Sequence, residues 1–248
     1  NIFLKREDLQ PVRSFKIRGA FNKINNLSNE QKAKGVVCVS AGNHAQGVAY
    51  SSKLLNLNSD FFVPENTPLQ KINSINKFLN KDSNLHIVGN NFDSCLEISK
   101  KFSIKNNKEF IHPFNDYDII YGQATVATEI YEDIDPDIII SCIGGGGLMS
   151  GISLYSKYVS NTCKLYGVES KGCNAMYQSI KMDKIVSLEN YDTFVDGAAV
   201  KEVGNLTFDI CKKNLEDIFL VSNGKLCNTL LDLYSTHGII AEPENLII

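Results

Sequence analysis

The sequence lacks any uninterrupted apolar run near the roughly 20 residues that a membrane-spanning helix requires. It also lacks an excess of positive charge, because 25 Lys and Arg residues stand against 28 Asp and Glu residues. Such an excess is typical of proteins that bind nucleic acid or anionic membranes. Tryptophan is absent, which we attribute to coding bias. These absences predict a protein that binds neither nucleic acid nor a membrane.

Cysteine is present, but not at the spacing of a metal site or a disulfide framework. The seven cysteines are odd in number and form no Cys-x-x-Cys pair. Most, such as Cys38 and Cys142, lie within apolar runs, which indicates reduced, buried thiols and a cytoplasmic protein. His112 and His237 have no partners at metal-ligand spacing. We therefore predict no metal site.

The two ends of the sequence favour a fragment. The chain begins at Asn1, without a methionine and directly in a strand-like segment at residues 2–4. It ends in an uncapped apolar run at residues 245–248. We interpret the sequence as lacking both ends, so an organellar leader stays open beside the cytoplasmic location.

Strand and helix patterns alternate along the chain. Short strands linked by helices predict an α/β fold with parallel-rich sheets flanked by helices. Pro113 and the loop after it mark the start of a second block. The β-branched run at 137–143 predicts a strand buried on both faces. The other strands are expected at 36–40, 60–63, 85–88, 110–111, 164–168 and 218–221, and the main helices at 43–55, 69–79, 92–102, 119–131, 148–158, 175–181, 203–213 and 225–234.

Residues 10–20 contain a candidate nucleophile. Ser14 is predicted to be a helix N-cap, because apolar residues at helical spacing follow it. Lys16 then lies in the first turn, where the helix dipole and burial both disfavour an ammonium. A neutral amine is what a Schiff base with an aldehyde cofactor needs. The alternative is an ordinary solvated lysine at a helix end.

Four consecutive glycines follow the strand predicted at 137–143 and precede a helix. Without Cβ atoms, the backbone N–H groups of such a turn can converge on an anion at the helix N-terminus. We therefore predict a phosphate cradle, with a flexible turn as the alternative. It is not a P-loop, since no Gly-Lys-Ser/Thr follows, and its spacing differs from a dinucleotide fingerprint.

A second strand-to-helix turn, at residues 40–44, repeats this logic. Its free N–H groups are predicted to hold a carboxylate. Asn43 offers an amide donor to a ring oxygen, or it is a plain helix cap. His44 is equally well explained as a hydrogen-bonded structural histidine. The two turns and Lys16 together indicate an amino-acid enzyme that uses pyridoxal 5′-phosphate (PLP).

Six segments closely resemble the threonine dehydratase (threonine ammonia-lyase) family of fold type II PLP enzymes. In the family's order, over essentially the whole chain, they are residues 5–11 (KREDLQP), 14–20 (SFKIRGA), 40–49 (SAGNHAQGVA), 144–148 (GGGGL), 196–201 (DGAAVK) and 241–243 (AEP). The AGNHAQG form is more similar to the dehydratases than to cysteine synthase or threonine synthase.

The resemblance implies a two-domain fold like that of the tryptophan synthase β subunit. Residues 1–34 plus 113–248 would form a large PLP-binding domain, and residues 35–112 a small, mobile, substrate-clamping domain. Lys16 would be the catalytic residue and would bind PLP covalently. The other cofactor-binding residues would be Phe15, Asn43, Gly144, Gly145, Gly146, Gly147 and Leu148. The substrate carboxylate would be bound by Ser40, Ala41, Gly42, Asn43 and His44.

The implied reaction is deamination of L-threonine to 2-oxobutanoate and ammonia, with L-serine as a secondary substrate. It would serve isoleucine biosynthesis or threonine catabolism in a homo-oligomer, a dimer or tetramer. The family's residue opposite the pyridine nitrogen is expected beyond Ile248. A related serine racemase subgroup binds a divalent cation through acidic residues; Glu169 matches one of them, but Ala175 stands where a second is expected, so no metal is predicted. The alternatives are a serine racemase or dehydratase of the same fold, and a non-catalytic protein that binds PLP or an amino acid.

Overall fold

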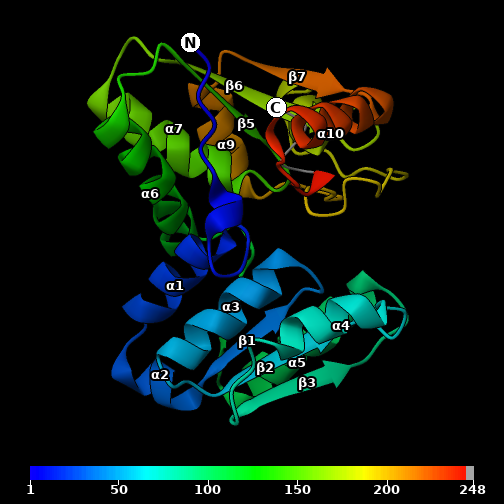
Figure 1. Cartoon of the computed structure of the whole chain (residues 1–248). Helices are drawn as coiled ribbons and strands as arrows, with labels where there is room; N and C mark the ends of the chain where they lie inside the picture. Colours follow the sequence, from blue (N-terminus) through cyan, green and yellow to red (C-terminus); the bar gives the residue numbers. More distant parts are fainter. Residues whose placement is uncertain (244–248) are drawn as a thin grey trace. The chain divides into compact units, whose positions relative to one another are not determined.

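The computed structural model describes residues 1–243, so the apolar run at 245–248 lies outside the described residues. The chain divides into two compact units, Asn1–Pro113 and Phe114–Ile248 (Figure 1). Each unit contains one parallel sheet with helices against it. No helix in the described part is both long enough and apolar enough to cross a membrane.

The first unit is built on a four-stranded parallel sheet in the order β3-β2-β1-β4. Helices α3 and α4 lie over one face of this sheet and α5 over the other (Figure 1). The face under α5 buries Val37, Val39, Phe62 and Cys95 in one cluster. The strands are β1 (Val36–Val39), β2 (Ser59–Val63), β3 (Ser83–Ile87) and β4 (Glu109–Phe110); the helices are η1 (Glu7–Leu9), α1 (Lys16–Asn26), α2 (Asn29–Lys34), α3 (Asn43–Leu54), α4 (Leu69–Asn76) and α5 (Phe92–Asn106).

The second unit has a three-stranded parallel sheet in the order β5-β6-β7. Helices α6 and α7 pack so closely that a Cβ on Gly151 would lie 2.5 Å from the Ile120 carbonyl oxygen. The strands are β5 (Ile138–Cys142), β6 (Lys164–Ser170) and β7 (Asp217–Val221); the helices are α6 (Tyr117–Asp133), α7 (Gly147–Val159), α8 (Ala175–Lys181), α9 (Asn205–Asn214) and α10 (Asn223–His237).

Local capping signals were informative at one helix and misleading at another. Ser28 and Gln31, which have the residue types and spacing of a capping box, form one at the start of α2, and Gly35 ends the helix with a φ of 90°. The predicted Ser14 cap is wrong. Phe15 occupies the N-cap of α1 in a helical conformation, and the Ser14 hydroxyl bonds to no first-turn N–H group. A turn that starts at Gln10, whose carbonyl accepts the Arg13 N–H, leads directly into the helix.

Two strand predictions were also wrong. Residues 2–4 form no strand; no described strand pairs with them, and Ile2 is 94% exposed. Strand β5 is present but is not buried on both faces, because Ile138 and Ile140 are 51% and 43% exposed. It lies at one edge of its three-stranded sheet, and only alternate residues point into the packed face.

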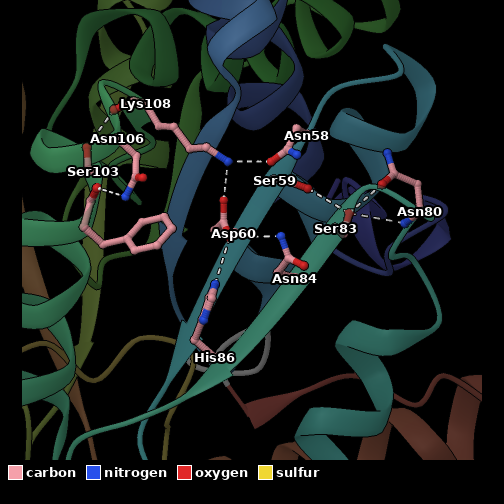
Figure 2. Close-up of polar contacts among 11 residues, drawn as sticks. Asn58, Ser59, Asp60, Asn80, Ser83, Asn84, His86, Ser103, Asn106 and Lys108 are labelled. Atoms are coloured by element: carbon pink, nitrogen blue, oxygen red, sulfur yellow. Dashed lines mark hydrogen bonds and ion pairs between the residues drawn. The ribbon is translucent and has the colours of Figure 1, made fainter.

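A buried polar network lies on the α5 side of the first sheet (Figure 2). One oxygen of the Asp60 carboxylate accepts from Lys108 Nζ at 2.5 Å, and the other accepts from His86 Nε2 at 2.8 Å and Asn84 Nδ2 at 3.2 Å. Lys108 also donates to Asn58 Oδ1 at 2.5 Å. The network joins strands β2 and β3 to the turn before β4, so it fixes the start of three strands.

Candidate functional site

The first unit places Lys16 at the first residue of α1. Its Nζ donates to the Pro113 carbonyl oxygen at 3.3 Å and lies 5.2 Å from the centre of the Phe15 ring. Helix α3 crosses close to this turn: a Cβ on Gly47 would lie 3.0 Å from the Lys16 carbonyl carbon and oxygen. The backbone of Lys16 is therefore held by direct helix packing, while its amine is held at the segment after β4.

The predicted carboxylate turn lies between β1 and α3. Gly42 is the N-cap of α3, and its N–H donates to Ser40 Oγ at 3.1 Å. Asn43 begins the helix, and its Oδ1 accepts from Gln46 Nε2 at 3.4 Å. A Cβ on Gly42 would meet no atom within 4 Å. The first N–H groups of a helix have no acceptor within that helix, so this turn has the chemistry of an anion site.

His44 is buried and hydrogen-bonded within the first unit. Its Nε2 lies 2.9 Å from the Ile111 carbonyl oxygen, so Nε2 carries the proton. Burial, reinforced by the nearby charge of Lys16 and more weakly by His112, lowers the pKa of His44 to about 3. This geometry is that of a hydrogen-bonded structural histidine, and it leaves the backbone of the turn, rather than the ring, to face an anion.

The topology of the first sheet explains why these residues meet. Strands β1 and β4 are parallel neighbours, so their carboxyl ends lie at the same edge. The turn at 40–44 follows β1, and residues 111–113 follow β4. In open parallel sheets this edge is where ligands bind. The fold thus brings Lys16 and the turn that holds Asn43 and His44 to one edge, although the two motifs are separate in the sequence.

The second unit contains the glycine turn between β5 and α7. Gly146 has a φ of 91° and is the N-cap of α7, which begins at Gly147. A Cβ on Gly145 would lie 2.2 Å from the Phe114 ring, and one on Gly144 would lie 2.9 Å from the Ala198 carbonyl oxygen. On Gly146 it would lie 2.7 Å from Met176 Cε. The turn is therefore tightly packed against Phe114, Ala198 and Met176, which argues against the flexible-turn alternative.

The start of α7 has the donors expected of a phosphate cradle. Its first-turn N–H groups have no acceptor within the helix, and the helix dipole there favours an anion. Leu148 is half-buried and packs against a core cluster that includes Cys142 and Val168. This contact anchors the first turn of the helix while its N–H groups remain available. Residues 144–148 are called the glycine loop below.

Glu169 caps a helix in the second unit. Its carboxyl oxygens accept from the N–H groups of Met176 at 3.1 Å and Tyr177 at 2.7 Å, at the start of α8. Burial raises the pKa of Glu169 to about 8, against the opposing effect of these two hydrogen bonds. Within residues 1–243, no three His, Cys, Asp or Glu side chains are grouped as metal ligands. This carboxyl thus has a structural partner of its own.

Several residues that shape the glycine loop were not singled out from the sequence. Phe114 and Ala198 pack against glycines, and Thr207 bonds to one of them. Ala198 lies in the DGAAVK segment, so the motif itself was a signal. Phe114 and Thr207 carried none, because an apolar residue in a loop and a threonine in a helix are common.

The profile of a family described as "Pyridoxal-phosphate dependent enzyme" matches residues 1–245 of the chain. The chain belongs to this family of pyridoxal-phosphate dependent enzymes. The expected cofactor class is thereby confirmed.

This PLP-family chain is similar in sequence to two curated proteins of the same name. It is 48% identical over 248 residues to the L-threonine dehydratase biosynthetic IlvA of Staphylococcus aureus (strain NCTC 8325 / PS 47). It is 49% identical over 245 residues to the protein of the same name from Halalkalibacterium halodurans. Each alignment covers 98% of this chain and 59% of the relative, so the chain spans about three-fifths of their length.

Solved structures confirm the fold prediction. The processed form of threonine deaminase isoform 2 from Solanum lycopersicum has a TM-score of 0.93 and 37% identity, over 98% of this chain and 70% of that one. Maize serine racemase has a TM-score of 0.92 and 31% identity, over 97% of this chain and 72% of that one. The expected fold type II PLP-enzyme architecture is therefore correct.

The residues present fit the family's cofactor. Lys16 supplies a primary amine, and the glycine loop supplies backbone donors for a phosphate. Ser14 Oγ, two residues before Lys16, is buried and has no hydrogen-bond partner within residues 1–243. A buried polar atom of this kind is costly unless a partner satisfies it, and a polar cofactor offers one.

Proposed function

We propose that this protein is a threonine ammonia-lyase that uses PLP to convert L-threonine to 2-oxobutanoate and ammonia. L-Serine is the secondary substrate. The observation that carries the proposal is that the chain's PLP-family sites occur in a sequence 48% identical to a protein named L-threonine dehydratase. The word "biosynthetic" in that protein's full name also favours a role in isoleucine biosynthesis over threonine catabolism.

Within this proposal, each site residue has a role that its surroundings support. Lys16 would hold PLP covalently through its amine, which lies 5.2 Å from the centre of the Phe15 ring. Asn43 would donate its amide N–H to the ring oxygen. The glycine loop, Gly144, Gly145, Gly146, Gly147 and Leu148, binds the phosphate through backbone N–H groups. When bound, PLP supplies an electron sink that stabilises negative charge at the substrate Cα.

The substrate is held and deprotonated by residues of the first unit. The backbone of Ser40, Ala41, Gly42, Asn43 and His44 binds the carboxylate at the start of α3. Once the substrate amine had replaced Lys16 on the cofactor, the freed Lys16 Nζ would take the proton from the substrate Cα, a step in which a positioned base contributes about 10²–10⁴-fold. Neutral His44 stays bonded to Ile111 and keeps the turn in place.

The wider organisation follows the same resemblance. A large domain formed by residues 1–34 plus 113–248 and a small mobile domain formed by residues 35–112 stay predictions. So do the homo-oligomer, dimer or tetramer, and the cytoplasmic location.

The experiment that tests the proposal incubates the purified protein with PLP and either L-threonine or L-serine. Mass spectrometry then measures 2-oxo acids, and chiral chromatography measures D-serine. We expect 2-oxobutanoate from L-threonine at a higher rate than pyruvate from L-serine. Bound PLP with no 2-oxobutanoate would contradict the proposal. Formation of D-serine from L-serine would support the racemase alternative. The similarity to maize serine racemase is the reason to test for it.

A further inference from the structure

Thr207 is a buried polar residue that contacts the glycine loop from another helix. It lies in the first turn of α9 and is 0% exposed. Its hydroxyl lies 2.6 Å from the Gly145 carbonyl oxygen and 3.1 Å from the Gly204 carbonyl oxygen. A threonine hydroxyl has one proton, and the shorter distance makes the Gly145 oxygen its main acceptor. The bond joins residues 62 positions apart.

This bond fixes the orientation of one peptide in the loop. The carbonyl and the N–H of a trans peptide point in opposite directions, and the described chain has no cis peptide bonds. Since the Gly145 oxygen points toward Thr207, the Gly146 N–H points away from it. Neither of the two neighbouring glycines has a Cβ that would restrict the orientation of this peptide, so the bond from Thr207 adds a restriction that the residues themselves do not supply.

Thr207 is itself held in place. The Leu206 N–H donates to Asn115 Oδ1 at 3.0 Å, and Asn115 Nδ2 donates to Asn205 Oδ1 at 2.8 Å. Helix α9 packs against α7, the helix that the glycine loop begins (Figure 1). The Thr207 side chain also contacts the loop directly, since a Cβ on Gly146 would lie 2.8 Å from Thr207 Cβ. The hydroxyl therefore acts from a rigid position.

We propose that Thr207 is a positioning residue that presents the Gly146 N–H to the phosphate of the cofactor. The inference rests on the proposed role of the glycine loop, and it adds a residue outside the loop that organises it before the ligand arrives. Removing the hydroxyl leaves the Gly145 carbonyl without its donor, so the peptide can turn and withdraw a phosphate contact. The loss of this contact would weaken the binding of ligands that carry a phosphate monoester.

The test compares two ligands that differ only in the phosphate, PLP and pyridoxal. Thr207→Val keeps the side-chain shape and removes the donor. We expect its affinity for PLP to fall about 10-fold, as for loss of one charge-assisted hydrogen bond, and its affinity for pyridoxal to change less than about 2-fold. Thr207→Ser keeps the hydroxyl and should restore the preference for PLP. Thr229→Val removes an exposed hydroxyl bonded to Lys225 O in α10 and is the matched control.

The outcomes separate positioning from general stability. Equal losses of PLP and pyridoxal affinity, or no loss of either, would overturn the proposal. If Thr207→Val does not fold, hydrogen exchange of the wild-type protein tests whether the Gly146 N–H contacts the phosphate. PLP should then protect the Gly146 amide from exchange, and pyridoxal should not. Protection by both ligands, or by neither, would overturn it as well. None of these measurements uses L-threonine, so failure of the proposed reaction would be seen separately in the 2-oxobutanoate assay.

Discussion

Substitution of Asp60 by alanine should destabilise the first unit far more than loss of an exposed carboxylate. The Asp60 side chain is 3% exposed, and that of its partner Lys108 is 14% exposed. The substitution removes the acceptor for Lys108, His86 and Asn84 at once (Figure 2). Lys108 then keeps only the neutral Asn58 oxygen as a partner within this network.

The expected cost follows from burial. Removing one member of a buried ion pair costs about 3–5 kcal/mol, because the other charge is left without compensation. The pair between Glu97 and Lys101 has side chains that are 68% and 73% exposed, so Glu97→Ala should have little effect on stability. The two substitutions each remove a carboxylate from the same unit, and the difference between them reports burial together with the number of donors left unpaired.

The pH dependence of the Asp60 contribution also has a definite sign. Burial alone would raise the pKa of Asp60, but the hydrogen bonds from His86 and Lys108 outweigh it and hold the pKa below its ordinary value of 3.8. The stabilisation is therefore complete above the unfolded-state pKa. It is lost as the pH falls below 3.8 toward the lower pKa of the folded state.

Urea unfolding at neutral pH measures both variants, and hydrogen exchange of the β2 amides assigns the change to the first unit. We expect Asp60→Ala to lower the free energy of unfolding several times more than Glu97→Ala. Equal, small effects of the two substitutions would refute the reasoning, since they would mean that Lys108 is solvated as well as Lys101 is.

Three further predictions follow from the sites. Gly145→Ala should lower PLP affinity at least about 10-fold in a fluorescence titration, because its Cβ would lie 2.2 Å from the Phe114 ring; Gly224→Ala, with no atom within 4 Å, is the control. The folded-state pKa of His44 is lowered to about 3, so its contribution to stability should fall by about 1.4 kcal/mol for each pH unit below 6.5. In urea unfolding, the stability of His44→Gln should therefore depend less steeply on pH below 6.5 than that of the wild-type protein. The folded-state pKa of Glu169 is raised from 4.5 to about 8, so its contribution should be full below 4.5 and be lost as the pH rises to 8, a trend that should be absent in Glu169→Gln. An unchanged pH slope in either variant would contradict the corresponding assignment.

Much of the fold was predictable because the local signals agreed with one another. Short β-branched runs alternate with amphipathic segments, and the helix at 175–181 was predicted with the bounds that the structure shows. The glycine loop and the turn at 40–44 were predictable for the same reason, since each lies between a strand and a helix. Sequence proximity was enough to place them.

What could not be predicted depends on contacts between distant segments. Whether residues 2–4 form a strand depends on a partner strand, and the exposure of Ile138 depends on the position of β5 at the sheet edge. The bond from Thr207 to Gly145 joins two motifs with no common sequence signal. Serine is a favoured residue type at helix caps, but the preceding turn makes Phe15, one residue after Ser14, the N-cap of α1.

The central claim is that Lys16 is the residue that bonds to the cofactor, and one measurement tests it most directly. The purified protein is mixed with PLP, reduced with borohydride, digested and mapped by mass spectrometry. Lys23 in the same helix is an internal control, since its ammonium pairs with Glu109 at 3.3 Å. We predict a pyridoxyl group on Lys16, none on Lys23, and no adduct in Lys16→Ala. An adduct on a different lysine, or none in the folded wild-type protein, would contradict the account.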